Sequence, residues 1–170
     1  AVESAPDRGT TVSVYLPVSK AVGEGRAPAA PPAAHGTEHI LFLDDEAPIA
    51  HMGGKMLERL GYAVTTCTSS VDALARFNAR PHYFDLVITD MTMPEMSGEA
   101  LAGRMLAIRP DLPIILCTGY SKLIDEGEAR RMGIRAFVYK PVTKADLART
   151  VREVLATSKE TAADPSPLAN

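Results

Sequence analysis

From residue 37 onward, short apolar runs alternate with longer stretches in which apolar residues recur every three or four positions. A short apolar run is typical of a buried strand, whereas the longer spacing is typical of an amphipathic helix. We therefore predict strands at residues 39–44, 63–68, 85–90, 113–118 and 136–140, with helical segments between them and after the last.

Residues with known positional preferences mark the helix boundaries. Pro48 suits the first turn of a helix and Gly61 suits a helix end, so we place the first helix between them. We predict a second helix over residues 71–79 with Ser70 as its N-cap, and we predict Thr143 as the N-cap of the last helix. A hydroxyl oxygen suits this position because it can accept a hydrogen bond from a free backbone N–H.

A third helix follows the third strand, and a fourth covers roughly residues 123–132. Within the first helix, Gly53 and Gly54 are expected to weaken the helix locally by about 1 kcal/mol each relative to Ala.

Five strand–helix units in strict alternation predict an α/β fold, a doubly wound parallel five-stranded sheet of the (βα)5 type with helices on both faces. The middle strands are the most apolar, as expected for strands that are buried on both faces. Ligands of such sheets bind outside the carboxyl ends of the strands. The residues that end the strands are therefore the first candidates for a functional site.

The chain before this domain has a different character. Residues 9–17 (GTTVSVYLP) alternate apolar and polar side chains, which predicts a strand, and we expect its partners in a missing part of a longer protein. Ala, Pro and Gly dominate the next segment, which predicts a flexible linker. We divide the chain into a remnant (1–18), a linker (19–36), a folded domain (37–158) and a disordered tail (159–170).

Composition narrows the function only slightly. The chain has 170 residues, 46% of them hydrophobic, and a formal net charge of −3, which gives no support for binding nucleic acid or an anionic membrane. The sequence contains no apolar stretch long enough to cross a bilayer. Cys67 and Cys117 lie in apolar or β-rich segments, so we predict free buried thiols in the cytoplasm, with a disulfide as the alternative.

Chemically useful side chains end four of the five predicted strands. The first strand ends in the acid pair Asp44 and Asp45, the third in Asp90, the fourth in Thr118 and the fifth in Lys140. Each residue alone has an ordinary structural explanation, such as a turn or a solvated charge. Because the carboxyl ends of parallel strands share one edge of the sheet, their combination predicts a common site.

The three carboxylates suggest what this site binds. Clustered carboxylates repel one another unless a cation lies among them. Mg²⁺ prefers oxygen ligands and is usually held by one or two carboxylates together with waters and phosphate oxygens. We therefore predict a magnesium ion between the acid pair and Asp90.

Four motifs carry a resemblance to a known family. DDE (44–46), DMTMPEMSG (90–98), TGY (118–120) and YKP (139–141) resemble, in order and spacing, the receiver domains of two-component response regulators. The resemblance covers residues 38–158. It implies the flavodoxin-like strand order 2-1-3-4-5 and a cis peptide bond before Pro141.

The resemblance also implies a chemistry. Asp90 would accept a phosphoryl group from a phosphohistidine and become an aspartyl phosphate. Asp45 and Asp90 would bind Mg²⁺ directly, Asp44 would act mostly through water, and the backbone carbonyl of Thr92 would complete the protein ligands. The chain would then catalyse its own phosphorylation and dephosphorylation, although it need not be an enzyme in the usual sense.

Three further residues receive roles from the resemblance. Lys140 would pair with one phosphoryl oxygen, and the Thr118 hydroxyl would bind another once the group arrives. The inward movement of Thr118 would let Phe137 rotate and so switch a partner-binding face. Phe137 lacks the hydroxyl that many relatives carry at this position, and ordinary core packing is its alternative role.

The donor histidine and the rest of the protein lie outside these motifs. GTTVSVYLP resembles the closing strand of the ATP-binding domain of histidine kinases, which implies a hybrid histidine kinase, with a stand-alone regulator as the alternative. None of the four histidines resembles a phosphodonor: His35, His39, His51 and His82. The expected partner is a phosphohistidine. It would belong either to a histidine kinase in the same polypeptide or to a histidine phosphotransfer protein.

Two other functions compete with the phosphoacceptor. A pseudo-receiver would bind partners without being phosphorylated, but such domains usually lack one of the acids or the lysine. A haloacid-dehalogenase-like phosphatase also forms an aspartyl phosphate, but its nucleophile lies on the first strand and its acidic metal ligands come late. Here the acid pair comes first, which argues against the phosphatase.

Overall fold

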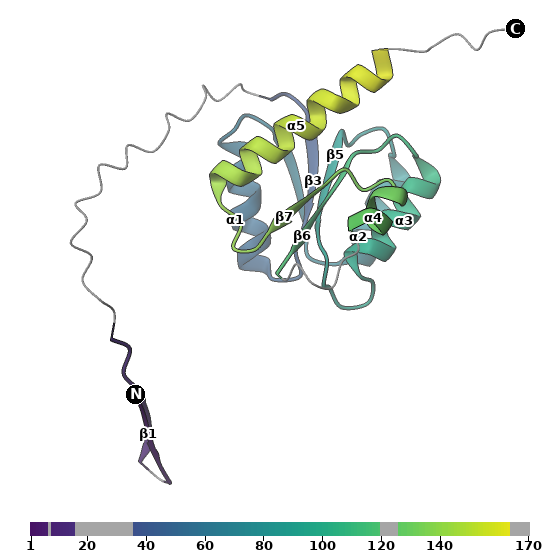
Figure 1. Cartoon of the computed structure of the whole chain (residues 1–170). Helices are drawn as coiled ribbons and strands as arrows, with labels where there is room; N and C mark the ends of the chain where they lie inside the picture. Colours follow the sequence, from purple (N-terminus) through teal and green to yellow (C-terminus); the bar gives the residue numbers. More distant parts are fainter. Residues whose placement is uncertain (7, 16–35, 120–125, 164–170) are drawn as a thin grey trace, which may run out of the picture. The chain divides into compact units, whose positions relative to one another are not determined.

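The computed structural model describes residues 1–6, 8–15, 36–119 and 126–163, which fall into two units, one within residues 1–31 and one within 32–170 (Figure 1). In the first unit, β1 (Val2–Ala5) pairs antiparallel with β2 (Gly9–Val12), and both strands are exposed along their whole length. β2 covers only the first four residues of the strand predicted over 9–17. Its partner lies in this chain, so the expectation that its partners lie in a missing part of a longer protein is wrong for this pairing. The predicted linker lies almost wholly outside the described residues.

The second unit is built on one parallel sheet of five strands. They are β3 (His39–Leu43), β4 (Ala63–Cys67), β5 (Leu86–Asp90), β6 (Ile114–Thr118) and β7 (Ala136–Tyr139). Their order across the sheet is β4-β3-β5-β6-β7, and every neighbouring pair is parallel. Numbered within this unit, the order is 2-1-3-4-5, so the predicted fold class and strand order are confirmed.

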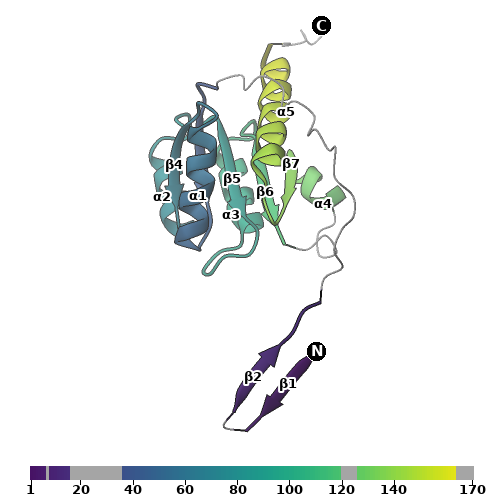
Figure 2. The same ribbon diagram turned by 90° about the vertical axis from the view of Figure 1, so that its left-hand side faces the viewer.

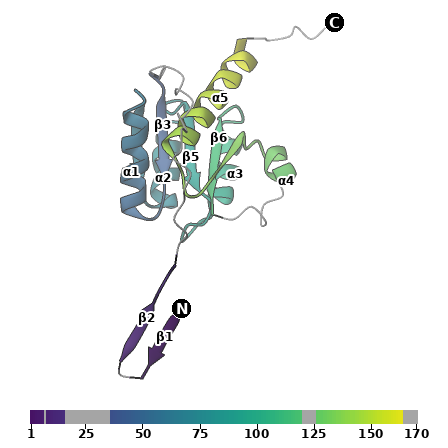
Figure 3. The ribbon, with the colours of Figure 1, turned by 60° about the vertical axis from the view of Figure 1, so that its left-hand side comes forward.

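Helices cover both faces of this sheet (Figures 1 and 2). α1 (Ala47–Glu58) and α5 (Lys144–Ala163) lie on one face, and α2 (Ser70–Ala79) and α3 (Gly98–Ile108) lie on the other. The short α4 (Glu126–Arg131) lies near β7 at the edge of the sheet (Figure 2), and Figure 3 shows it on the opposite side of the second unit from α1. None of the helices in the described part of the chain is long and apolar enough to span a membrane.

Two helix boundaries differ from the prediction. Ser69, not Ser70, is the N-cap of α2, and its hydroxyl accepts a hydrogen bond of 3.3 Å from the backbone N–H of Asp72. α5 continues to Ala163, so the predicted disordered tail is wrong for residues 159–163, while 164–170 lie outside the described part. The start of the predicted fourth helix also lies outside it. Thr143 does accept a hydrogen bond at the start of α5, as predicted.

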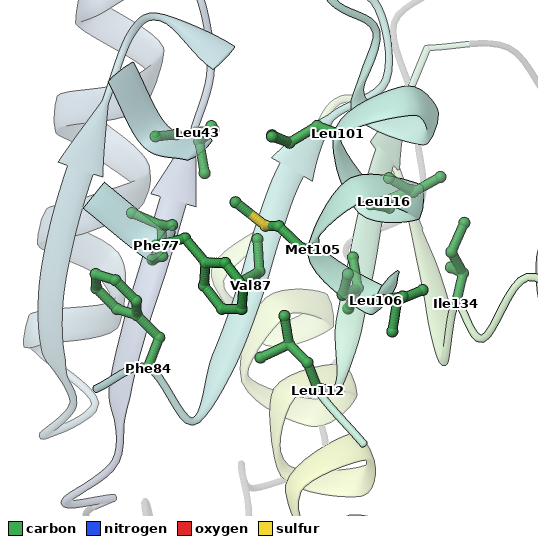
Figure 4. Packing of buried hydrophobic residues seen from close by; sticks show 14 of the residues in the cluster. Leu43, Phe77, Phe84, Val87, Leu101, Met105, Leu106, Leu112, Leu116 and Ile134 are labelled. Carbon is green, nitrogen blue, oxygen red and sulfur yellow. The ribbon is translucent and has the colours of Figure 1, made fainter. Parts of the chain in front are cut away.

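The sheet separates two apolar cores. Side chains from α2 and α3 meet β3, β5 and β6 in the first core, where Phe77, Val87 and Met105 lie against one another (Figure 4). The second core lies beneath α1 and α5 and contains Leu57, Leu147 and Val151. Each fully buried side chain of this kind stabilises the fold by roughly 1.5–3 kcal/mol, which holds the strand ends in a fixed arrangement.

Gly53 and Gly54 have a packing role that the sequence did not reveal. A Cβ atom added to Gly53 would lie 2.3 Å from the ring of Phe42, and one added to Gly54 would lie 2.6 Å from the side chain of Thr66. Real Cβ atoms do not approach other atoms so closely. The two glycines therefore let α1 approach the sheet, and this packing offsets their low helix propensity.

Both cysteines are free and buried, as predicted, and they belong to the cores on opposite faces of the sheet. Burial, together with the nearby charge of Asp90, raises the pKa of the Cys117 thiol to about 12, although the charge of Lys140 acts to lower it. At pH 8 we expect Cys117 to resist alkylation by iodoacetamide in the folded protein and to react once urea unfolds the chain. Peptide mass spectrometry checks this; rapid labelling of Cys117 in the folded protein would contradict it.

Candidate functional site

An ammonium group joins two of the predicted carboxylates at the carboxyl edge of the sheet. Lys140, which directly follows β7, places its Nζ atom 2.9 Å from Oδ2 of Asp44 and 2.9 Å from Oδ1 of Asp90. Asp44 directly follows β3, and Asp90 ends the neighbouring strand β5. Three strand ends that are far apart in the sequence therefore meet at one point, as the sequence predicted.

The centre of this site is largely withdrawn from water. Asp44 is 1% exposed and Asp90 is 6% exposed, so each carboxylate depends on protein partners. Partial burial acts to lower the pKa of Lys140, but its hydrogen bonds to Asp44 and Asp90 outweigh that effect and raise the pKa above its ordinary value. The three groups carry two negative charges and one positive charge at neutral pH, which leaves a net negative charge.

Backbone hydrogen bonds hold the strand ends in register. The N–H of Asp44 donates to the carbonyl of Cys67 at 3.3 Å, and the N–H of Lys140 donates to the carbonyl of Thr118 at 2.8 Å. One oxygen of Asp44 also accepts a 3.0 Å hydrogen bond from the N–H of Glu46, which fixes the turn into α1. The Lys140–Pro141 peptide bond is cis, as the resemblance implied.

The other predicted residues lie at the same edge but are not all gathered around the lysine. Thr118 ends β6 and is buried (4% exposed), whereas Asp45 and Thr92 are exposed. Across residues 36–119 and 126–163, no three His, Cys, Asp or Glu side chains are grouped as a ready-made metal site. Phe137 is half-buried and packs against the core beneath α2 and α3, which agrees with the packing role.

The donor chemistry of the site nevertheless fits a hard cation. The carboxylates of Asp44 and Asp90 are buried oxygen donors whose charge Lys140 only partly neutralises. A divalent cation near them would remove the remaining charge, and oxygen ligands are those that Mg²⁺ prefers. The exposed carboxylate of Asp45, next in the chain to Asp44, is a third oxygen donor at the same strand end.

A tight loop follows Asp90 and returns the chain to α3. The N–H of Gly98 donates to the carbonyl of Met91 at 2.9 Å, which closes residues 91–97 into a compact turn. A Cβ atom on Gly98 would lie 2.1 Å from the backbone oxygen of Asp90. The sequence places Gly98 in a motif but does not reveal its role, because only the folded chain brings Gly98 against the backbone of Asp90.

Gly98→Ala is therefore expected to disturb the site as well as the fold. The added methyl group must displace either the end of β5 or the start of α3, which should lower the free energy of unfolding by about 2 kcal/mol. If Asp90 accepts a phosphoryl group, as the family resemblance implies, the displacement should also slow that reaction. Urea unfolding and initial rates with acetyl phosphate measure the two effects. A matched control is Gly103→Ala on the same helix, where the nearest atom to an added Cβ is 4.0 Å away; an equally mild effect of both substitutions would contradict the prediction.

Comparisons with known proteins show the family of this chain. Residues 40–152 match the family model described as the response regulator receiver domain. The sensor kinase CckA of Brucella abortus is 31% identical over 167 residues, which cover 90% of this chain and 17% of that protein. The transcriptional regulatory protein ZraR of Salmonella typhimurium is 33% identical over 129 residues, or 76% of this chain and 29% of that protein. The chain thus spans less than a third of each of these relatives.

Solved structures show the same fold. A response regulator receiver domain protein from Clostridium thermocellum has a TM-score of 0.69 at 32% identity and covers 73% of this chain and 98% of its own. A CheY-like receiver domain protein from Methanospirillum hungatei has a TM-score of 0.68 at 28% identity, with 74% and 99% covered. In both comparisons, nearly the whole of the solved chain is covered by the match.

Proposed function

The chain belongs to the response regulator receiver domain family, and from this premise we propose that it accepts a phosphoryl group on Asp90 in two-component signalling. The observation that carries the proposal is the ammonium of Lys140, which lies 2.9 Å from both Asp90 and Asp44. It holds the carboxylate of Asp90 at the end of a buried strand and places a positive charge where phosphoryl oxygens would develop negative charge.

The proposed transfer needs little covalent help from other residues. A carboxylate oxygen of Asp90 attacks the phosphorus atom of a phosphohistidine and forms a P–O bond, while the P–N bond breaks and its electron pair stays on the imidazole nitrogen. Lys140 then exchanges part of its contact with the carboxylates for a phosphoryl oxygen. The buried hydroxyl of Thr118 lies at the end of the adjacent strand and donates to another phosphoryl oxygen.

Receiver domains generally bind Mg²⁺ for phosphorylation. We assign the ion in this chain to the carboxylates of Asp44, Asp45 and Asp90 and to the backbone carbonyl of Thr92. When bound, it supplies positive charge that offsets the carboxylates and the incoming phosphoryl oxygens. The buried, incompletely neutralised pair of Asp44 and Asp90 supports this assignment.

The response to phosphorylation is assigned to Thr118 and Phe137. Thr118 is paired in register with Tyr139, two residues beyond Phe137, so movement at the end of β6 is passed directly to β7. Phe137 is only partly buried where it packs against the core, so the proposed rotation would not need to open a closed interior. A partner-binding face that includes β7 is the proposed output.

The partners and context extend this proposal. The proposed donor is a phosphohistidine, either of a histidine kinase in the same polypeptide or of a histidine phosphotransfer protein. We propose no contact of this chain with nucleic acid or with a membrane. The β1–β2 hairpin exposes Val2 and Val12, which are paired across the strands, as the remnant of a kinase ATP-binding domain would. Two free thiols agree with a cytoplasmic location.

Incubation with Mg²⁺ and acetyl phosphate tests the central claim. Intact mass spectrometry should show one added phosphoryl group, and chelation of the metal should prevent the addition. If the folded protein binds Mg²⁺ but gains no phosphoryl group from acetyl phosphate or from a phosphorylated histidine kinase, the phosphoacceptor proposal fails and the pseudo-receiver alternative replaces it.

A further inference from the structure

The loop that follows Asp90 is tied to the start of α2 by a side-chain contact. The hydroxyl of Ser69 donates a hydrogen bond of 3.1 Å to Oε2 of Glu95, which lies 26 positions further along the chain. Ser69 belongs to the turn between β4 and α2, and Glu95 belongs to the loop over residues 91–97. This contact therefore connects two loops at the carboxyl edge of the sheet.

Ser69 serves both loops with one hydroxyl group. Its oxygen accepts the N–H of Asp72 at 3.3 Å and so caps α2, while its single hydrogen is available for Glu95. The acceptor is a carboxylate at the N-terminal end of a helix, where negative charge is favoured. Beside it, the buried hydroxyl of Ser70 makes a longer contact of 3.4 Å with the carbonyl of Pro94.

The loop adopts a conformation that needs support from more than one side. Glu95 has φ = 68°, a left-handed value that a residue with a side chain seldom adopts. On the inner side, Met93 and Met96 pack against the core beneath α2 and α3. On the outer side, Ser69 donates a hydrogen bond to the side chain of Glu95. Thr92 lies in this loop between Asp90 and Met93.

We propose that Ser69 and Glu95 are positioning residues for the magnesium site, because their contact holds the loop that presents the backbone carbonyl of Thr92. The inference rests on the proposed function, in which that carbonyl is a metal ligand. Hydrogen bonds outside the ligand shell commonly change metal affinity by an order of magnitude or more, because they fix the ligands in place.

A role in metal binding differs measurably from a role in stability. Glu95 is exposed, so loss of its hydrogen bond should change the free energy of unfolding only slightly. Ala adopts φ = 68° with about the same difficulty as Glu, so Glu95→Ala leaves the backbone strain in place. Mg²⁺ affinity, by contrast, should respond to any loosening of the loop.

The experiment is a double-variant cycle with Mg²⁺ as the probe. Magnesium chloride is titrated into the ¹⁵N-labelled full chain, and amide shifts at the carboxyl edge of the sheet give the dissociation constant. The variants are Glu95→Ala, Ser69→Gly, which keeps an acceptable N-cap, and the double variant. Glu95→Gln retains an acceptor without the charge, and Arg76→Ala is a control that removes an exposed ion pair elsewhere on α2.

Glu95→Ala and Ser69→Gly should each weaken Mg²⁺ binding about tenfold, and the double variant should be no weaker than either. Glu95→Gln and Arg76→Ala should stay within about twofold of the unaltered chain. Dissociation constants that do not change in Glu95→Ala, or losses that multiply in the double variant, would overturn the inference. If the unaltered chain itself binds no Mg²⁺, the proposed magnesium site fails instead, so the two failures are distinguishable.

Discussion

Asp90→Asn is expected to abolish phosphoryl incorporation from acetyl phosphate while the protein remains folded. The amide of Asn is neutral and is a far weaker nucleophile than the carboxylate, so no acyl phosphate can form at this position. Its oxygen can still accept a hydrogen bond from Lys140. The substitution also removes one of two buried negative charges that share a single ammonium group, so we expect no loss in the free energy of unfolding.

The measurement pairs intact mass with a stability control. Asp111→Asn is a suitable comparison, because its side chain is 77% exposed and lies outside the site, and it should be phosphorylated like the unaltered chain. Urea unfolding shows that Asp90→Asn is folded. If this variant still gains a phosphoryl group, the acceptor is a different residue, and the roles assigned to Lys140 and Thr118 must be revised.

The sequence was enough to predict the strands and the edge at which their functional ends meet. A mostly apolar run that ends in a charged residue is a local pattern, as in Leu86–Asp90. Parallel strands then bring such ends together at one edge of the sheet. The strand order did not follow from these patterns and came only from the family resemblance. The strand patterns alone could not tell Asp44 from Asp45, and their separate roles came from the resemblance. In the structure Asp44 is buried against Lys140, whereas Asp45 is exposed.

Two kinds of feature could not be predicted from the sequence: contacts between segments far apart in the chain, and the role of one residue when an adjacent residue has the same side chain. Ser69 and Ser70 are adjacent hydroxyl residues, and only the backbone geometry decides that Ser69 caps α2. From the sequence, Gly53 is expected only to weaken its helix. In the structure, the ring of Phe42 fills the space that a side chain at position 53 would need. Glu95 carried no signal at all, because its partner lies in another loop.

Lys140→Met should destabilise the protein by about 3 kcal/mol at pH 7 in the absence of Mg²⁺, because it leaves two buried carboxylates without their shared positive charge. Met has a similar length and is apolar, so the loss reports mainly the charge. Urea unfolding in EDTA measures it. Lys55→Met is the control, because the ion pair of Lys55 with Glu58 has side chains that are 52% and 44% exposed and should contribute less than about 1 kcal/mol.

The pH dependence and the metal dependence of this loss follow from the same charges. The pKa of Lys140 is raised above its ordinary value of 10.5 in the folded protein, so its stabilising effect is fully present below that pH and is lost as the pH rises through the folded pKa. The difference in the free energy of unfolding between the two proteins should therefore be constant from pH 7 to about 10 and shrink above it.

Mg²⁺ should stabilise Lys140→Met more than the unaltered chain, since the ion replaces the missing positive charge. Equal stabilisation of both proteins by Mg²⁺ would mean that the ion does not bind beside Asp44 and Asp90.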